Sequence, residues 1–388
     1  MQIARLAVIA PVFPSNEEPH RGTYVYHTVR RLQKHCDVTV WCVAPRSLLP
    51  ARFRREYLPR GPRTSLADVK THFIEHFSFP FLSRACNGAA CAAALRKRLA
   101  GDKPDGVVAY WAYPHGFAGL RLASELQIPC LVGLFGSDIN SIPDWVTKRR
   151  VVETLRQASR IVSVSEDLRL RAISLGARPD AIRTIKNGCD PEIFHLRDRR
   201  QDRRALGIAE DAALVVFVGW LMRSKGVFEL LQAMRTLVRT RPKAVLAMLG
   251  DGKDRKLLEK IARASGIGDR VLFLGAKKPC EVARWMGAAN FITLPSHAEG
   301  SPNAVIEALH CGRPVVASSV GGIPELIDEH CGILTPANDS MSLACALEKA
   351  LGCEWDEQGI AEARRRSWND VARETLAFLQ SPSPLGNS

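Results

Sequence analysis

The sequence has 388 residues, of which 46% are hydrophobic and 24% are charged. This length exceeds what a single hydrophobic core usually supports, so two domains are expected. No run approaches the roughly 18 apolar residues that span a bilayer, and the first residues, MQIARLAVIAPVFP, are typical of a short buried strand rather than a signal peptide. We therefore expect a cytoplasmic protein without a membrane span.

The formal net charge of +14 at pH 7 indicates either an anionic partner or solvated basic surfaces. Basic clusters lie at residues 52–63, 96–98, 148–150 and 364–366. The sequence has no helix-turn-helix, zinc-finger or aromatic-basic stacking pattern, so no nucleic-acid partner is expected. An anionic membrane surface suits residues 51–63, ARFRREYLPRGPR, because apolar side chains alternate there with arginines.

Eleven cysteines are scattered from Cys36 to Cys353 without CxxC pairs or histidines at metal-ligand spacing. Neither a disulfide framework nor a zinc site is indicated, and we expect reduced, mostly buried thiols. No D-x-D motif stands at a suitable strand end either, so the sequence does not require a metal.

Short β-rich runs alternate with longer helical patterns along the whole chain, which is typical of parallel α/β sheets built from βαβ units. In the first half, strands are expected at residues 6–10, 37–44, 105–110, 128–134 and 160–165. In the second half, strands are expected at residues 213–219, 244–250, 270–275, 289–295 and 313–318.

A highly charged stretch, HLRDRRQDRRALGI (195–208), separates the two halves and is interpreted as a hinge. We expect two Rossmann-like, doubly wound parallel-sheet domains that face a cleft, at residues 1–190 and 191–362. Residues 363–388 are expected to form a helix, around 368–379, that crosses back to the first domain before a flexible tail. Ligands in open α/β sheets bind beyond the carboxyl ends of strands, so the site is expected in those loops.

The stretch HAEGSPNAVIEALHCG (297–312) is expected to form a loop and a helix after the strand at 289–295. Ser301 suits the N-cap, Pro302 suits the first helical position, and Gly312 suits the end of the helix.

The mouth of this helix suits an anion. Backbone N–H groups from Ser301 to Ala304 and the helix dipole form a site that matches a diphosphate. Glu307, one to two turns further along, can accept both hydroxyls of a ribose, and Glu299 would lie near the sugar on the far phosphate. Two carboxylates would repel a bare phosphate unless each binds hydroxyls, so their placement favours a sugar nucleotide.

The same stretch resembles the E-x7-E segment of retaining glycosyltransferase family 4, whose members have the GT-B fold. Four further segments resemble family motifs in the right order, namely NGCDPEIF (187–194), VGWLMRSKGVFELLQA (218–233), LGDGKDRKLLEKIA (249–262) and GGIPELI (321–327). RGTYVYHTVRRL (21–32) is similar to the family's first phosphate-side loop. YWAYPHG and GSDIN are similar to acceptor-side segments of a bacterial cell-surface polysaccharide subgroup.

The resemblance implies that the first domain binds the acceptor and the second binds the donor. Lys225 is implied to contact the diphosphate. Trp220 stands where the family usually has arginine, so either Arg223 takes the place of that arginine or Lys225 and the helix mouth suffice alone. Glu299 is implied to orient the sugar and to stabilise positive charge at the anomeric carbon. For Gly250, the alternative to contact with the donor is a purely structural turn. The implied donor contacts are Gly22, Gly250, Gly275, Lys277, Gly300, Ser301, Pro302, Asn303, Ala304 and Glu307.

On the acceptor side, the sequence departs from the subgroup's pattern. Tyr110 replaces a histidine, His115 replaces an aspartate, and Phe135 stands where arginine or histidine is usual. His115 is grouped with the catalytic residues and interpreted as touching the sugar or acceptor, with a surface loop as the alternative. Asp138 is interpreted as binding acceptor hydroxyls or as capping the turn after Gly136, and Tyr110 is assigned to the acceptor side.

The activity implied by the resemblance is a metal-independent, retaining hexosyl transfer (EC 2.4) from a UDP- or GDP-sugar, without a further cofactor. The implied acceptor is a saccharide carried on a lipid, in exopolysaccharide or lipopolysaccharide assembly by a peripheral protein at the inner face of the plasma membrane. The alternatives are a sugar-nucleotide hydrolase or epimerase of the same fold, and a basic polyanion- or membrane-binding protein with a vestigial donor site. A nicotinamide-dependent dehydrogenase is disfavoured, because no strand is followed by G-x-G-x-x-G with an acidic residue about 20 positions later.

Overall fold

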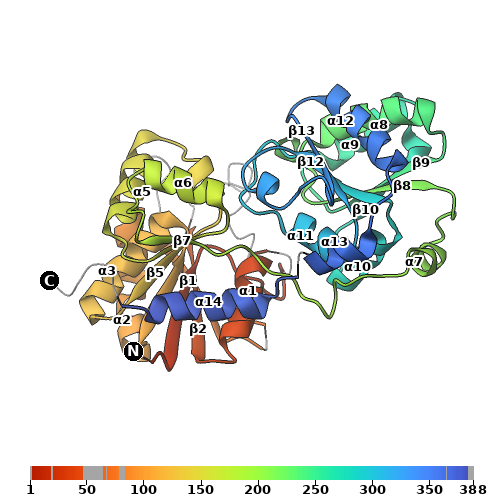
Figure 1. The fold of residues 1–388 in the computed structure, drawn as a ribbon. Helices are drawn as coiled ribbons and strands as arrows, with labels where there is room; N and C mark the ends of the chain where they lie inside the picture. Colours follow the sequence, from red (N-terminus) through yellow and green to blue (C-terminus); the bar gives the residue numbers. More distant parts are fainter. Residues whose placement is uncertain are drawn as a thin grey trace. The chain divides into compact units, whose positions relative to one another are not determined.

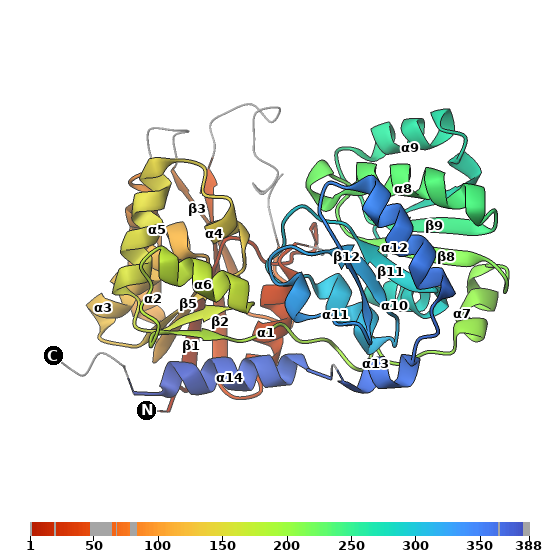
Figure 2. The same ribbon diagram turned by 45° about the horizontal axis from the view of Figure 1, so that its top comes forward.

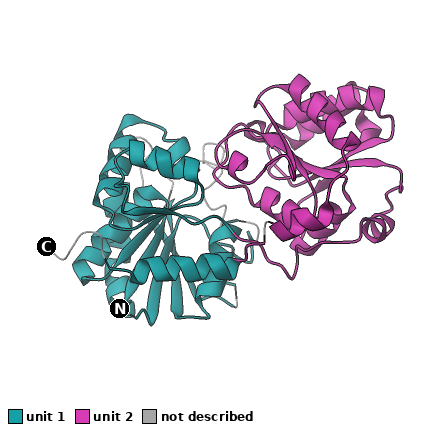
Figure 3. Cartoon of the chain, in the orientation of Figure 1, with its two compact units in different colours: residues 1–187, 368–388 teal, residues 188–367 magenta. Residues whose placement is uncertain are grey.

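The computed structural model describes residues 2–18, 21–46, 64–66, 68–77, 84–363 and 365–382. The chain forms two compact units (Figure 3). Unit 1 comprises Met1–Asn187 together with Trp368–Ser388, and unit 2 comprises Gly188–Ser367. The divisions therefore fall at 187/188 and 367/368, where the sequence analysis expected them at 190/191 and 362/363. The basic segment 51–63, considered for membrane binding, lies outside the described residues.

Unit 1 is built on a seven-stranded parallel sheet in the order β3-β2-β1-β4-β5-β6-β7 (Figure 1). Val8 in the central strand β1 pairs with Val40 on one side and with Val108 on the other. Such strands are buried on both faces, which explains their continuous apolar runs. The strands are β1 Arg5–Ala10, β2 Asp37–Arg46, β3 Thr71–Phe77, β4 Gly106–Tyr110, β5 Cys130–Leu134, β6 Ile161–Ser163 and β7 Ile182–Thr184.

Successive side chains of β1 pack into different layers, as the two-residue repeat of a strand requires. Leu6 and Val8 pack against α1 and the last helix, α14, which lie side by side (Figures 1 and 2). Ala7 and Ile9 pack in the layer that contains α2 and α3. The helices of unit 1 are α1 Thr23–Leu32, α2 Asn87–Asp102, α3 Phe117–Leu126, α4 Ser137–Asn140, α5 Trp145–Gln157, α6 Glu166–Ser174 and α14 Trp368–Gln380.

Unit 2 has a six-stranded parallel sheet in the order β10-β9-β8-β11-β12-β13 and one continuous hydrophobic core. Its strands are β8 Ala213–Val218, β9 Ala244–Leu249, β10 Val271–Gly275, β11 Phe291–Leu294, β12 Val315–Ser318 and β13 Gly332–Thr335. Its helices are α7 Arg199–Leu206, α8 Val227–Thr240, α9 Arg255–Ala264, α10 Pro279–Ala288, α11 Asn303–His310, α12 Ser340–Gly352 and α13 Glu357–Ala363.

The prediction that residues 195–208 form a hinge is wrong. This stretch contains α7, which belongs to unit 2 and packs against α10. Asp202 and Arg203 on this helix are only 4% and 3% exposed. Their charges are accommodated because Arg197 forms an ion pair with Asp202 at 2.6 Å, and because Arg203 donates to oxygens of the surrounding chain. The high charge of this segment therefore did not indicate that all of it is exposed to solvent.

The parallel strands of unit 2 bring their carboxyl ends to one edge of the sheet. The loops that follow β8, β9, β10, β11 and β12 consequently start at the same edge, which is where ligands bind in open α/β sheets. In the part of the chain that the structure describes, no helix is long and apolar enough to cross a membrane.

Candidate functional site

Lys225 lies at the end of the loop that follows β8. The chain leaves β8 at Val218, forms a short 3-10 turn over Arg223–Lys225, and enters α8 at Val227. Gly226 follows the lysine with a φ of +67°, and a Cβ at this position would lie 1.9 Å from the carbonyl oxygen of Pro295. The residue after Lys225 must therefore be glycine, because the loops after β8 and β11 touch through their backbones.

Lys225, the cation predicted to contact the phosphates, lies next to Glu299, the carboxylate predicted to contact the sugar. Lys225 Nζ lies 2.5 Å from Glu299 Oε1, and the side chains are 24% and 10% exposed. The hydroxyl of Ser296 donates to the same Oε1 at 2.7 Å. Ser296 is completely buried. The carboxylate of Glu299 is thus held by a cation on one side and a buried hydroxyl on the other.

Ser296 is a site residue that the sequence analysis missed. It follows β11 by two residues, so its position next to the carboxyl end of a buried strand was the available signal. Gly321 was quoted only as part of a family segment. A Cβ on Gly321 would lie 1.9 Å from the carbonyl oxygen of Glu299, so the loop after β12 supports this residue directly.

Helix α11 begins later than predicted. Its first residue is Asn303, and Pro302 occupies the N-cap position with φ −74° and ψ 118°. The assignments of Ser301 as N-cap and of Pro302 as first helical residue are therefore wrong. Pro302 also has no N–H group, so only Ser301, Asn303 and Ala304 of the predicted anion-binding run can donate. Gly312, which follows the helix, has the left-handed conformation expected of a C-terminal glycine, with φ +72°.

Glu307 lies in the second turn of α11 and is half-buried. Burial raises the pKa of its carboxyl group to about 7. Its charge also raises the pKa of two buried thiols, Cys189 and Cys311, so the three side chains are neighbours. Among the described residues, no side chain is hydrogen-bonded to the carboxyl group of Glu307, which leaves both oxygens available to a ligand.

Three glycines bring the neighbouring loops into close contact. The N–H of Gly250 donates to the carbonyl of Gly275 at 2.9 Å. Gly250 has a φ of +140°, and a Cβ there would lie 1.9 Å from the carbonyl oxygen of Gly219. Gly250 is therefore needed for close packing of the loop backbones, and its contact with a nucleotide stays a prediction, as does that of Gly275.

Two predicted donor-side cations have other partners in the structure. Arg223 is exposed, and its guanidinium lies 4.4 Å from the ring centre of Phe228. Its backbone N–H donates to Asp254 at 2.8 Å. Lys277 lies 3.5 Å from the carboxylate of Glu281. The contact of Arg223 with the diphosphate and the contact of Lys277 with the donor stay predictions.

Gly22 precedes α1 in unit 1 and has a φ of +70°. A Cβ on this residue would lie 2.7 Å from the carbonyl oxygen of Val12 in the loop after β1. This close approach explains why glycine is needed there, whereas contact with the donor stays a prediction.

Asp138 caps two loops at the carboxyl ends of β4 and β5. One oxygen accepts from the N–H groups of Phe135 and Gly136, at 3.2 and 2.9 Å, and the other accepts from Ala112 N–H at 3.2 Å. Burial raises the pKa of Asp138, although these backbone hydrogen bonds oppose the shift. Of the two interpretations offered from the sequence, the structure contains the turn cap.

Tyr110 and His115 are buried. Tyr110 is 4% exposed and packs against Phe135, with ring centres 5.1 Å apart, and burial raises the pKa of its hydroxyl. His115 is 3% exposed, and its Nε2 lies 2.8 Å from the carbonyl oxygen of Val43. Burial lowers the pKa of His115 to about 4, so the ring is neutral at pH 7.

The surface-loop alternative for His115 is therefore wrong, because the kinked segment Ala112–Gly116, in which Tyr113 has an extended backbone, carries the ring into the interior. The catalytic role of His115 and the acceptor role of Tyr110 have no support in this geometry. A direct contact would require each buried ring to leave its packing.

Two Rossmann-like sheets, with a lysine, two glutamates and a helix mouth at the carboxyl edge of the second, define a GT-B glycosyltransferase. The chain is a glycosyltransferase whose two parts match two family models of this class. Residues 22–193 match the family model described as Glycosyltransferase Family 4, and residues 198–374 match that of Glycosyl transferases group 1.

The relatives differ in how much of the chain they match. TuaC of Bacillus subtilis, named as a glycosyltransferase of teichuronic acid biosynthesis, is 29% identical over 88% of this chain and 87% of its own length. A D-inositol 3-phosphate glycosyltransferase of Saccharomonospora viridis is 32% identical, but the match covers only 60% of this chain and 57% of that protein. The Anabaena protein Alr3699/HepE, solved in complex with UDP-glucose, superimposes with a TM-score of 0.73 at 19% identity, over 98% of this chain and all of that one. At this identity, the superposition supports the GT-B fold alone.

Proposed function

We propose that this glycosyltransferase moves a hexosyl group, with retention of configuration, from a nucleoside-diphosphate sugar to a hydroxyl of a lipid-linked saccharide. The observation that carries the proposal is the arrangement of Lys225, Glu299 and Ser296 beside the mouth of α11. Glu307 lies further along that helix, and its carboxyl group has no hydrogen-bond partner among the described residues. A cation and backbone donors suit the diphosphate, and carboxylates suit the hydroxyls of sugar and ribose.

In the proposed reaction, the bond between the anomeric carbon and the β-phosphate oxygen breaks, and a bond from the acceptor oxygen to that carbon forms on the same face. The acceptor's proton passes to the departing diphosphate. Negative charge that develops on the diphosphate is stabilised by Lys225, by the N–H groups at the mouth of α11 and by Arg223. Because no step needs a cation beyond these, we expect activity to persist in EDTA.

A donor that binds here must replace both partners of the ion pair between Lys225 and Glu299. The diphosphate competes with Glu299 for the ammonium group, and a sugar hydroxyl can replace the ammonium on the carboxylate. Ser296 keeps one oxygen of Glu299 in place during this exchange. Glu299 then orients the sugar and stabilises positive charge at the anomeric carbon.

The proposed biological setting draws on the relatives and on the charge of the chain. TuaC is named for teichuronic acid biosynthesis, and UDP-glucose is bound in the HepE structure. Together with the formal charge of +14, these likenesses support a UDP-sugar donor and cell-surface polysaccharide assembly by a cytoplasmic protein, peripheral on the inner membrane face.

Calorimetric titration with UDP, GDP, ADP and their glucose and galactose derivatives tests the donor site. We expect one base to bind selectively and Glu307→Ala to abolish binding. Glu329→Ala is the matched control, because the side chain of Glu329 is 85% exposed in the same unit. If no nucleotide binds, the glycosyltransferase proposal is overturned. Sugar-nucleotide breakdown without any acceptor would instead favour the hydrolase or epimerase alternative.

A further inference from the structure

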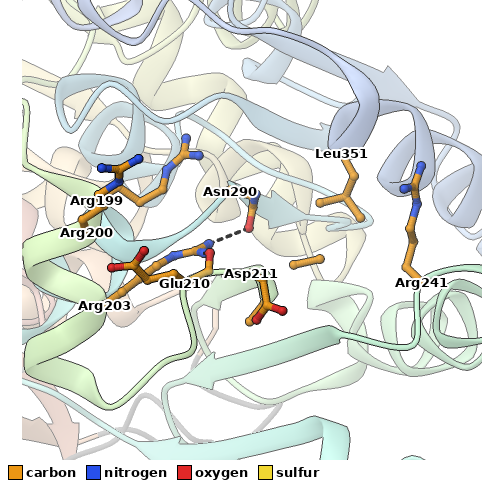
Figure 4. A pocket seen from close by; sticks show the side chains of 10 residues that line it. Arg199, Arg200, Arg203, Glu210, Asp211, Arg241, Asn290 and Leu351 are labelled. Carbon is orange, nitrogen blue, oxygen red and sulfur yellow. Dashed lines mark hydrogen bonds between the residues drawn. The ribbon is translucent and has the colours of Figure 1, made fainter.

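Unit 2 contains a pocket of about 350 Å³ that is separate from the donor site (Figure 4). It lies at the amino ends of the strands, since its lining includes Ala213, the first residue of β8, and Asn290, which directly precedes β11. Lys225 follows the carboxyl end of β8. The six residues of β8 separate the two ends by about 20 Å, so this pocket and the donor site lie at opposite edges of one sheet.

Three arginines of α7 line one side of this arginine pocket, as Figure 4 shows, and Leu351 of α12 lines another. Arg203 is the most buried of the three, with 3% exposure. It donates to the carbonyls of Ala288 and Glu210, at 2.9 and 2.5 Å, and to Asn290 Oδ1 at 2.8 Å. All of these acceptors are neutral, so the guanidinium is fixed in place without a counter-ion within ion-pair distance among the described residues.

The pocket lining carries more positive than negative charge, with Arg199, Arg200, Arg203 and Arg241 against Glu210 and Asp211. Arg199 and the fully buried Arg313 both pair with one carboxylate, Glu357. Burial and the charges of Arg199 and Arg313 lower the pKa of Arg203, whereas Glu210 and Asp211 oppose this shift.

The two acidic side chains at the pocket do not balance this charge, because Asp211 already pairs with Lys243. Arg241 at the rim pairs with Glu348 at 2.7 Å. Arg200 is exposed, and its guanidinium forms no hydrogen bond or ion pair within the described part of the chain. The pocket therefore combines one fixed guanidinium, Arg203, with one adaptable guanidinium, Arg200, and a single uncommitted carboxylate, that of Glu210.

We propose that the arginine pocket binds a phosphomonoester or a free phosphate dianion, independently of the donor site. Planar guanidinium groups match phosphate oxygens in a bidentate manner, and a dianion supplies the counter-charge that a buried arginine lacks. The volume is at the lower end for small-molecule sites, and Leu351 with Ala212 and Ala213 offers an apolar wall for the carbon part of an ester.

Calorimetry in a chloride buffer, with glycerol 3-phosphate and inorganic phosphate as probes, tests this assignment. We expect Arg200→Glu to weaken binding at least tenfold and Glu210→Gln to strengthen it severalfold. Arg204→Glu is the matched control, because Arg204 is an exposed arginine on the same helix that does not line the pocket. It carries the same change in charge and should leave affinity within twofold of the wild type.

The donor-site variant Lys225→Ala distinguishes the two sites and should keep phosphate binding intact. The proposal fails if neither probe binds at millimolar concentration, if Arg200→Glu and Arg204→Glu act alike, or if Lys225→Ala abolishes binding. Phosphatidylcholine vesicles with and without phosphatidic acid, tested with the wild type and Arg200→Glu, determine whether the phosphomonoester is soluble or a lipid headgroup.

Discussion

Glu307 has a carboxyl group whose pKa is raised to about 7 by burial, so its charge changes within the physiological range. Its ionised form accepts two hydroxyls, whereas the protonated form gives up one acceptor position. We therefore expect the affinity for a nucleotide sugar to rise between pH 6 and pH 8, by up to about tenfold. A nucleotide sugar is the right probe, because the terminal phosphate of a free nucleoside diphosphate titrates near pH 6 itself.

Glu307→Gln should remove this pH dependence, and a 2′,3′-dideoxy donor should lack it with the wild type. The effect on stability has the opposite sign. Because the folded-state pKa lies above the usual value of 4.5, the stabilisation by the bound proton is complete below pH 4.5 and is lost as pH rises through about 7. Unchanged donor affinity across this range would exclude Glu307 from ribose binding.

Ser296 acts on the reaction only through Glu299, so its removal tests positioning. We expect Ser296→Ala to lower kcat about tenfold with a small change in KM, because the hydroxyl fixes a carboxylate oxygen at 2.7 Å. Ser318→Ala is the control, since Ser318 is buried at the end of β12 and its hydroxyl has no hydrogen-bond partner in the described structure. Ser296→Thr should recover part of kcat, and equal losses in both alanine variants would contradict the positioning role.

At the scale of elements, the contact between the loops after β8 and β11 depends on Gly226. Gly226→Ala combines left-handed strain with a Cβ placed 1.9 Å from Pro295 O. We expect a loss of more than about 3 kcal/mol in the free energy of unfolding, or a displaced Lys225 with donor binding lost. Gly207→Ala is the matched control, because Gly207 has a similar φ of +68° but nothing lies within 4 Å of an added Cβ. It should cost only about 1 kcal/mol in chemical denaturation.

The sequence predicted the central strands well and the edge strands poorly. Ten strands were expected, and each overlaps an observed strand; the three missed strands, β3, β7 and β13, all lie at sheet edges. Edge strands have less apolar surface to bury, and β7 is only three residues long. Their short or polar sequences therefore carry little of the pattern that marks a buried strand.

The sequence correctly placed site residues that depend on loop position, whereas it misjudged the burial of others; the chemical roles of all of them stay predictions. Lys225 and Glu299 are brought together, which follows from their positions after neighbouring parallel strands. His115 is buried because an irregular, kinked segment follows β4, and the sequence of that segment resembles an exposed loop. Arg203 is buried because backbone carbonyl groups accept hydrogen bonds from its guanidinium. The pattern of charged side chains in the sequence does not reveal these backbone acceptors.

At the scale of the whole molecule, unit 1 is assembled from both ends of the chain. Helix α14 covers α1 with Trp368, Val371 and Ala372, which are at most 6% exposed. Ala372→Asp places a charge in this core and should cost at least about 3 kcal/mol in thermal unfolding of unit 1. Ala377→Asp, on the exposed face of the same helix, should change stability by less than about 0.5 kcal/mol. Equal effects would show that α14 adds little to unit 1.

This division of unit 1 has a consequence during protein synthesis. All of unit 2 emerges from the ribosome before α14, so the continuous unit can complete its core while the first 187 residues still lack their last helix. The apolar side chains of α1, which ends at Leu32, therefore stay uncovered until α14, which begins at Trp368, is synthesised about 336 residues later. A nascent chain halted shortly before Trp368 should therefore hold a native second sheet and an unfinished first one, a state in which proteases and chaperones meet unit 1 first.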